Sequence, residues 1–269
     1  SCKTMILFNN EPIIIKHFPN GESLLDKPFF EKYRYVEKEV NNIITLKYES
    51  DVDLFQLLLV RKSFWFPCDL HITYFPYSRM DRQSESYVFT LKTVAKFINW
   101  LDWNSVKIYE PHSDVTPALL NKCRIIPIMT SLLSKTDFNN EIDYVFYPDA
   151  GAHKKYSDVI KAKNELIGFK KRDFTTGKIK ELQILGSLRK DARVFIIDDL
   201  CSKGGTFKLA GQQLKAMGAR EVNLVVAHCE QTIFEGTLLT EPIITKIYTT
   251  NSIIRQEHKK IISFDLNTL

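Results

Sequence analysis

The residues with the clearest chemical potential lie in residues 194–207 (VFIIDDLCSKGGTF), where an apolar run ends in two carboxylates and a polar loop. Asp198 and Asp199 stand at the end of the predicted strand and can accept hydrogen bonds from two vicinal ribose hydroxyls. The loop offers backbone N–H groups, a hydroxyl and a helix N-terminus to a phosphate, and its glycines permit close approach. Its residues are Ser202, Lys203, Gly204, Gly205 and Thr206. The pattern predicts a sugar-phosphate site, but it also fits a plain strand end with a helix cap.

A second segment carries paired arginines directly after another β-rich run. In residues 75–83 (FPYSRMDRQ), Arg79 and Arg82 are planar donors suited to polyphosphate, and Asp81 between them can orient an arginine. Two arginines beside an aspartate also form ordinary surface salt bridges. Their position after a strand, together with the other polar strand ends, favours a nucleotide-phosphate site.

Two further strand ends carry a histidine and an aspartate. His112 lies in YEPHSD (109–114) and Asp149 lies in YPDAGAHKK (147–155). A single histidine here is commonly structural, whereas carboxylates combined with substrate phosphates are the usual environment of Mg²⁺. The basic segment GFKKRDF (168–174) carries long cations that can neutralise a phosphoryl group, or else it is a solvated basic loop. Its cations are Lys170, Lys171 and Arg172.

These segments must be positioned by the strands and helices around them. Short runs rich in Val, Ile, Tyr and Phe alternate with helix-like stretches, which predicts parallel sheets with helices on both sides. Expected strands are residues 4–9, 42–48, 69–75, 105–111, 143–148, 192–199, 221–228 and 246–250. Expected helices lie near residues 51–63, 87–103, 154–163, 205–217 and 230–238. Ligands of such sheets bind at the carboxyl ends of the strands, where the polar segments lie.

The alternation of strands and helices runs twice along the chain. It pauses around residues 125–141, which predicts two α/β domains, 1–135 and 136–269. The N-terminal domain would then hold the arginine pair and His112, and the C-terminal domain would hold the sugar-phosphate loop and the basic segment.

Composition excludes several other classes of protein. Hydrophobic residues make up 44% and charged residues 26% of the chain, with a net charge of +5, which is a globular balance. No apolar run approaches the ~20 residues of a membrane span, and no secretory signal is expected. The five cysteines are widely spaced and odd in number, which favours a reducing, cytoplasmic compartment. Because no nucleic-acid motif accompanies the basic residues, neither nucleic acid nor membrane is an expected partner.

Together, the motifs resemble those of the phosphoribosyl diphosphate (PRPP) synthetase family over residues 5–255. Residues 194–207 resemble the PRPP-binding motif shared with type I phosphoribosyltransferases, and residues 75–83 resemble the Tyr-x-Arg-Gln-Asp-Arg signature that contacts ATP. HFPNGES (17–23), otherwise an ordinary hairpin turn, resembles the element that reaches the adenine site of a neighbouring subunit. KIYTTNSI (246–253) resembles a segment beside the sugar phosphate. The resemblance implies two type I phosphoribosyltransferase-like domains, each a mostly parallel sheet flanked by helices.

The resemblance also implies roles in a transfer of diphosphate from ATP to the C1 hydroxyl of a ribose phosphate. ATP would contact Phe18, Asn20, Glu22, Arg79, Asp81, Arg82 and His112. Mg²⁺ would be held by His112 and Asp149, and the sugar phosphate by Asp198, Asp199 and the 202–206 loop. Lys170 and Arg172, with Lys171 between them, fall where the family has its catalytic Lys-Arg-Arg loop. A homo-oligomer, either a dimer or a hexamer, is expected because the adenine element acts across a subunit boundary in the family.

The sequence departs from the family pattern at four places. Met80 replaces the signature Gln, Asn20 replaces an Asp, and Ser202-Lys203-Gly204 replaces Asp-Thr-Ala, while no closing helix precedes Leu269. The loop change removes a negative charge and adds a positive one, which suits a phosphodiester better than a terminal phosphate. ADP-ribose, the acceptor ascribed to some phage-encoded relatives in NAD⁺ rebuilding, is therefore an alternative to ribose 5-phosphate.

Two other function classes stay open at this point. A type I phosphoribosyltransferase would consume PRPP, but it needs no ATP site, so the Arg79–Arg82 segment and His112 argue against it. A regulatory relative without turnover is kept open by Met80 and Asn20. The retained carboxylate pair and basic segment argue against that reading.

Overall fold

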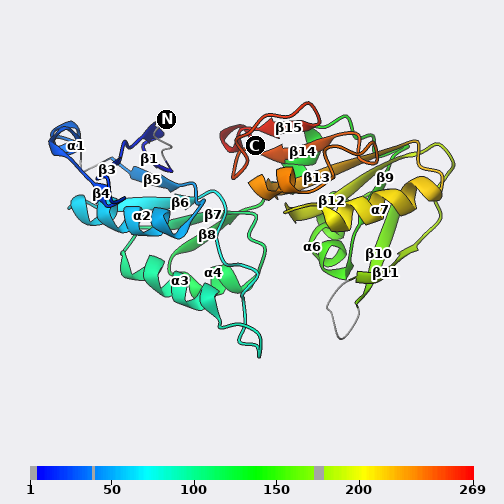
Figure 1. Cartoon of the computed structure of the whole chain (residues 1–269), viewed down its shortest axis with the longest axis horizontal. Coiled ribbons are helices and arrows are strands. Elements are labelled where there is room, and N and C mark those ends of the chain that lie inside the picture. Colours follow the sequence, from blue (N-terminus) through cyan, green and yellow to red (C-terminus); the bar gives the residue numbers. More distant parts are fainter. Residues whose placement is uncertain (1–4, 38–39, 173–178) are drawn as a thin grey trace. The chain divides into compact units, whose positions relative to one another are not determined.

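The computed structural model describes residues 5–37, 40–172 and 179–269, and the side chains of residues 171–172 and 179–181 lie outside that description. The chain forms two compact units, Ser1–Ile126 (unit 1) and Pro127–Leu269 (unit 2) (Figure 1). This division precedes the 135/136 boundary predicted from the sequence, because helix α5 (Met129–Ser134) packs against strands of unit 2. Each unit is a mostly parallel sheet with flanking helices, which confirms the predicted α/β class.

Unit 1 is built on a sheet with the strand order β2-β1-β5-β6-β7-β8. Its elements are β1 (Ile6–Phe8), β2 (Glu11–Pro12), β3 (Lys16–His17), β4 (Ser23–Leu24), α1 (Lys27–Tyr33), β5 (Asn42–Leu46), α2 (Asp51–Ser63), β6 (Cys68–Ile72), α3 (Thr90–Trp100), β7 (Val106–Tyr109), α4 (Val115–Leu119) and β8 (Cys123–Ile126). Strands β5 to β8 are parallel, whereas β1 is antiparallel to both β2 and β5. The arginine segment follows β6 and the histidine segment follows β7, so both leave the same edge of the sheet.

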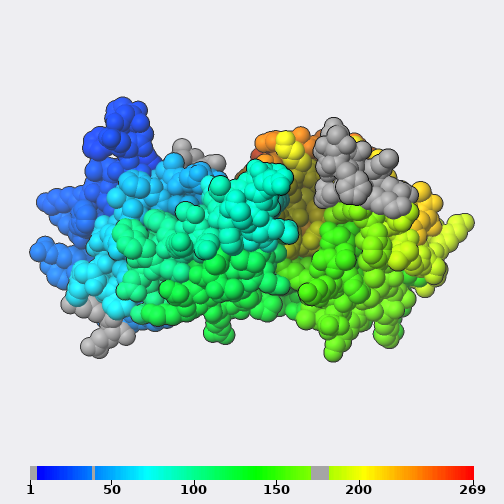
Figure 2. Space-filling view, turned by 90° about the horizontal axis from the view of Figure 1, so that it is seen from below, coloured from blue at the N-terminus to red at the C-terminus, as the bar shows by residue number. Residues whose placement is uncertain are grey.

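Helix α2 shows how the sequence sets a boundary in unit 1. The Asp53 carboxylate turns back and accepts the backbone N–H groups of Glu49 and Ser50 at 2.8 and 2.7 Å, which caps the helix start. Leu57 and Val60 lie one helical turn apart and are fully buried in the core of unit 1. In the space-filling view, the face of unit 1 turned to the reader is formed by the cyan-to-green segments that include α3 and α4 (Figure 2).

Unit 2 is built on a sheet with the strand order β11-β10-β9-β12-β13-β14-β15. Its elements are α5, β9 (Tyr144–Tyr147), α6 (Ala150–Ile160), β10 (Glu165–Arg172), β11 (Ile179–Leu185), β12 (Arg193–Cys201), α7 (Gly205–Ala216), β13 (Glu221–Cys229), the 3₁₀ helix η1 (Gln231–Glu235), β14 (Ile247–Thr250), β15 (Ile261–Phe264) and η2 (Leu266–Thr268). Among the described strands of this unit, only β10 and β11 pair antiparallel. The continuous apolar run of β13 is almost wholly buried, as expected of a strand covered on both faces.

The central strand β12 presents alternate side chains to the two faces of its sheet. Val194 and Ile196 join the core that α7 covers, while the Phe195 ring meets Phe138 edge-on at 5.2 Å between centroids. This alternation anchors β12 from both sides and ensures that the residues after it emerge at one end of the sheet.

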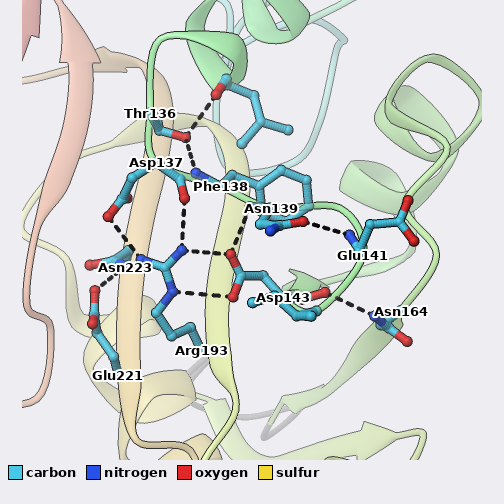
Figure 3. Close-up of polar contacts among 12 residues, drawn as sticks. Thr136, Asp137, Phe138, Asn139, Glu141, Asp143, Asn164, Arg193, Glu221 and Asn223 are labelled. Atoms are coloured by element: carbon cyan, nitrogen blue, oxygen red, sulfur yellow. Dashed lines mark hydrogen bonds and ion pairs between the residues drawn. The ribbon is translucent and has the colours of Figure 1, made fainter.

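A partly buried ion network holds the start of unit 2 to β12 (Figure 3). Arg193 donates to both oxygens of the Asp143 carboxylate at 3.1 and 2.7 Å and to Asp137 at 2.8 Å. Asp143 is only 2% exposed and also accepts the Asn139 N–H. Tyr248 donates its hydroxyl to the second oxygen of Asp137 at 3.0 Å. Because a buried carboxylate is costly without a partner, this network fixes the chain that leads from α5 into β9.

Two sequence-based predictions about the elements of unit 2 are corrected by the structure. The basic segment from Gly168 to Arg172 is not a loop, since it lies in β10 and pairs with β11. Gly168 interrupts the apolar pattern by which this strand could have been predicted. The structure requires glycine there, because a Cβ would lie 2.7 Å from the Pro148 carbonyl oxygen. Instead of a helix over 230–238, the structure has the single short helix η1, which ends at Gly236. No helix in the described part of the chain is both long and apolar enough to cross a bilayer.

Candidate active site

The two adjacent carboxylates of unit 2 lie near the end of β12, beyond the point where the strand pairs with β9. The strand pairs with β13 up to Cys201, but its pairing with β9 stops at Ile196. Asp198 and Asp199 therefore lie within the strand, three and two residues before its end, where its pairing with β9 has stopped. The Asp199 N–H donates to the Asp198 carboxylate at 2.8 Å. Burial, and then the charge of Asp199, raise the pKa of Asp198 well above its usual range.

A lysine that the sequence analysis did not select reaches this pair. Lys155 of α6 places its Nζ 2.9 Å from Oδ2 of Asp199, and the side chains are 27% and 8% exposed. Forty-four positions separate the two residues, so no local pattern in the sequence indicates the contact. The only sequence signal was the basic end of YPDAGAHKK.

A second lysine–carboxylate pair flanks the first. Asp149 is the N-cap of α6, where its carboxylate accepts the Ala152 N–H at 3.0 Å, and Lys170 of β10 donates to its Oδ2 at 3.0 Å. Burial alone would raise the pKa of Asp149, but these hydrogen bonds outweigh it and lower the pKa below its usual value. The structure thus brings Asp149, Lys170 and Lys155 together with the carboxylates of β12, as the sequence predicted for the first two. The side chains of Lys171 and Arg172 lie outside the described residues.

The loop after β12 leads directly into the N-terminus of α7. Gly204 has φ +85°, a conformation that favours glycine, and an added Cβ would come 2.7 Å from Leu238. Gly205 begins the helix, and a Cβ there would meet nothing within 4 Å. The free N–H groups of the first turn and the helix dipole make this end of α7 suited to a phosphate.

The segment after β13 supports this loop from behind. The Ser202 hydroxyl lies 2.9 Å from the Thr232 hydroxyl, which donates to Glu230 at 3.1 Å. Lys203 pairs with Glu235 at 3.0 Å, and both side chains are mostly exposed. These supporting residues were missed from the sequence, where residues 230–238 were assigned to a helix.

In unit 1, a hydrogen bond joins two of the predicted ATP-contact segments. The Ser113 hydroxyl donates to the Asp81 carboxylate at 2.8 Å, so the segments that follow β6 and β7 lie side by side. Asp81 also lies 3.5 Å from the Arg82 guanidinium, which is largely exposed. Arg79 and His112 are exposed as well. Tyr77, five residues after the end of β6, has φ +62°, which marks a sharp turn in the arginine segment.

The third unit 1 segment forms the turn of the β3–β4 hairpin. Phe18, Asn20 and Glu22 all have exposed side chains, and the Phe18 ring is 50% exposed. The Asn20 side-chain oxygen accepts the Glu22 N–H at 3.2 Å, and Gly21 has φ +91°. Asn20 thus shapes the turn, as an aspartate at this place could also do.

The carboxylates of unit 2 have the chemistry that Mg²⁺ prefers. Among the described residues, no group of three or more His, Cys, Asp or Glu side chains forms a ready metal cage. Mg²⁺ commonly binds through one or two carboxylates and completes its shell with water and substrate phosphates. Asp149, whose side chain is 41% exposed, fits that arrangement. Its expected partner His112 belongs to the other unit.

Known proteins resemble this chain in sequence and in fold. No family model matches the chain. The ribose-phosphate pyrophosphokinase of Saccharolobus solfataricus is 26% identical over 261 residues, covering 94% of this chain and 88% of the relative. That of Sulfurisphaera tokodaii is 28% identical over 262 residues with the same coverage. The solved phosphoribosylpyrophosphate synthetase of Mycobacterium smegmatis superposes with a TM-score of 0.72 at 14% identity, covering 94% of this chain and 86% of that one.

The fold defined by these units is that of two type I phosphoribosyltransferase-like domains in one chain. Relatives carrying one name align along nearly the whole sequence, and the motifs of both units lie at the ends of parallel strands. The chain is similar to these enzymes along nearly its whole length, which supports the PRPP synthetase family.

Proposed function

We propose that the protein is a Mg²⁺-dependent diphosphokinase that transfers the β,γ-diphosphate of ATP to the C1 hydroxyl of ribose 5-phosphate and releases AMP. The observation that carries the proposal is the arrangement at the end of β12. Two carboxylates lead directly into a glycine loop and the N-terminus of a helix, beside two lysine–carboxylate pairs. This arrangement supplies acceptors for a diol and donors for a phosphate at neighbouring positions in the chain.

The sugar phosphate is held by unit 2. Asp198 and Asp199 accept hydrogen bonds from the ribose hydroxyls, and the loop from Ser202 to Thr206 donates backbone N–H groups to the 5-phosphate. Lys170 moves from Asp149 to the transferring phosphoryl group and neutralises the charge that grows in the transition state. Lys171 and Arg172 are proposed to assist it.

The nucleotide is bound by the segments of unit 1. Arg79 and Arg82 bind the polyphosphate, with Asp81 orienting the guanidinium of Arg82. The exposed hairpin residues Phe18, Asn20 and Glu22 contact adenine. When bound, Mg²⁺ would supply charge neutralisation for the triphosphate, held by Asp149 and His112. The proposal requires the two sets of residues to meet around one nucleotide, within a subunit or across a homo-oligomer.

ADP-ribose is kept as a second acceptor because of one observation. Gly205 has open space around it, so the loop leaves room for a group that extends from the 5-phosphate. The cation expected to favour that acceptor, Lys203, is already paired with Glu235, so ribose 5-phosphate remains the main proposal. Use of ADP-ribose would connect the protein to NAD⁺ metabolism, and use of ribose 5-phosphate would connect it to nucleotide synthesis. The cytoplasm is the proposed location in either case.

An acceptor screen tests the proposal directly. The protein is incubated with ATP and Mg²⁺ and with ribose 5-phosphate, ADP-ribose or no acceptor, and AMP is measured by chromatography. We expect acceptor-dependent AMP with ribose 5-phosphate and none without Mg²⁺. No AMP with either acceptor, but diphosphate release from PRPP and a nucleobase, would identify a phosphoribosyltransferase instead. Nucleotide binding without any turnover would identify a regulatory relative.

A further inference from the structure

The carboxylate of Asp199 is the more deeply buried of the two proposed diol ligands. Asp199 is 5% exposed, whereas Asp198 is half-buried. The Lys155 ammonium lies 2.9 Å from it and reaches it from the second turn of α6. A carboxylate with so little access to water is stabilised chiefly by a charged hydrogen-bond partner.

The contact between Lys155 and Asp199 also links helix α6 to the last residues of β12, which β9 does not pair with. Strand β9 stops pairing with β12 at Ile196, and the chain turns at Asp149 into α6. Beyond that point no strand among the described residues pairs with β12 on the β9 side, and Lys155 reaches Asp199 there. The lysine therefore limits the directions in which the Asp199 carboxylate can point.

The two lysines of the site act on different carboxylates. Lys170 donates to Asp149, which is 41% exposed and proposed to hold Mg²⁺, whereas Lys155 donates to the buried Asp199. Lys155 is itself only 27% exposed. Its ammonium is directed at the Asp199 carboxylate rather than at the bulk solvent.

We propose that Lys155 is a positioning residue that orients Asp199 for the ribose hydroxyls and so determines recognition of the sugar. This inference rests on the proposed function, because it takes Asp199 to be a ligand of the diol. Lys155 acts through Asp199 and does not touch the substrate. Losing the ammonium should weaken binding of a sugar with both hydroxyls more than binding of a sugar that lacks one of them.

Calorimetric binding of ribose 5-phosphate and 2-deoxyribose 5-phosphate tests this without turnover. Lys155→Met should raise the Kd for ribose 5-phosphate about tenfold, a loss typical of a disturbed charged hydrogen bond. The preference for ribose 5-phosphate over the deoxy sugar should shrink by a similar factor. Lys155→Arg should restore most of the affinity, because the guanidinium keeps the charge and the donors. Lys154→Met, at the exposed neighbouring position on α6, is the matched control and should bind like wild type.

The outcomes separate this inference from the proposed function. If wild-type protein does not bind ribose 5-phosphate, both the proposed function and this inference fail. If wild type binds it but Lys155→Met keeps the same Kd and the same preference, only the inference is overturned. A purely structural role would weaken both sugars equally, and that result would also overturn it. Should Lys155→Met not fold, judged by circular dichroism, Lys155→Gln keeps an amide donor and is measured in the same way.

Discussion

Replacing Gly236 by alanine should displace the proposed phosphate loop without changing any residue of that loop. Gly236 ends the short helix η1 and has φ −93°, so alanine is allowed by the backbone. There is no room for the added methyl group, however. Its Cβ would overlap the carbonyl oxygen of Lys203 and lie 3.1 Å from the carbonyl carbon of that residue. The atoms nearest to the added Cβ all belong to the backbone of Lys203, so the clash cannot be relieved by a side chain changing its rotamer.

The size of the effect follows from this overlap. Because Cβ atoms keep at least 3.0 Å from such an oxygen, the loop and the Gly236 segment must separate by about 1 Å. Overpacking of this kind typically costs about 1–3 kcal/mol of stability. A misplacement of about 1 Å in a substrate-holding element can cost about 100-fold in rate. We therefore expect kcat/KM for ribose 5-phosphate to fall about 100-fold, with the KM for ATP nearly unchanged.

Steady-state AMP release at varied ribose 5-phosphate and ATP measures both quantities. Gly205→Ala serves as the control for stability, because a Cβ there meets nothing within 4 Å, and its unfolding midpoint should match wild type. A Gly236→Ala protein with wild-type kcat/KM for ribose 5-phosphate would refute the reasoning. It would mean either that the loop tolerates the shift or that it does not hold the phosphate.

Three further predictions concern other parts of the molecule. Arg193→Met leaves the buried Asp143 carboxylate without its guanidinium and should destabilise unit 2 by about 3–5 kcal/mol. Hydrogen exchange of the β9 and β12 amides in urea measures this loss of stability. A loss below about 1 kcal/mol would contradict the prediction. Lys170→Ala should lower kcat about 100-fold or more with little change in KM, measured by AMP release, and an unchanged kcat would show that this lysine is not catalytic. Burial, and then the charge of Lys107, lower the pKa of His71 from 6.5 to about 4. The unfolded chain then takes up the proton first, so unit 1 should lose about 1 kcal/mol, after allowance for solvent screening, as pH falls from 6.5 to 4. His71→Gln should remove that loss in urea titrations followed by tryptophan fluorescence, and an identical pH slope in the variant would contradict it.

Much of the fold could be predicted from the sequence because local pattern and tertiary environment agree. The helix Asp51–Ser63 was predicted with its observed bounds, since Asp53 caps it and Leu57 and Val60 fall on its buried side. The sequence of β13, which is rich in valine and almost wholly buried, likewise predicts a strand. The segments that follow the strands then fall at one edge of each sheet, as parallel pairing requires.

Other features depend on contacts that no local pattern contains. Strand β10 was taken for a loop because it has cations and Gly168, where an apolar alternation would be expected. The helix α6 starts four residues earlier than predicted because Asp149 caps it, although Gly151 weakens the helical pattern in the first turn. The pair between Lys155 and Asp199 joins residues 44 positions apart, and only the folded chain shows it.

The most direct test of the central claim is to follow the fate of the phosphorus atoms of ATP by ³¹P NMR. The protein is mixed with ATP, Mg²⁺ and ribose 5-phosphate, with an Asp199→Asn variant as the control. The account predicts AMP and a sugar carrying diphosphate on C1 in equal amounts, and a large loss of both in the variant. Formation of ADP or free phosphate in place of these products, or equal activity in the variant, would contradict it.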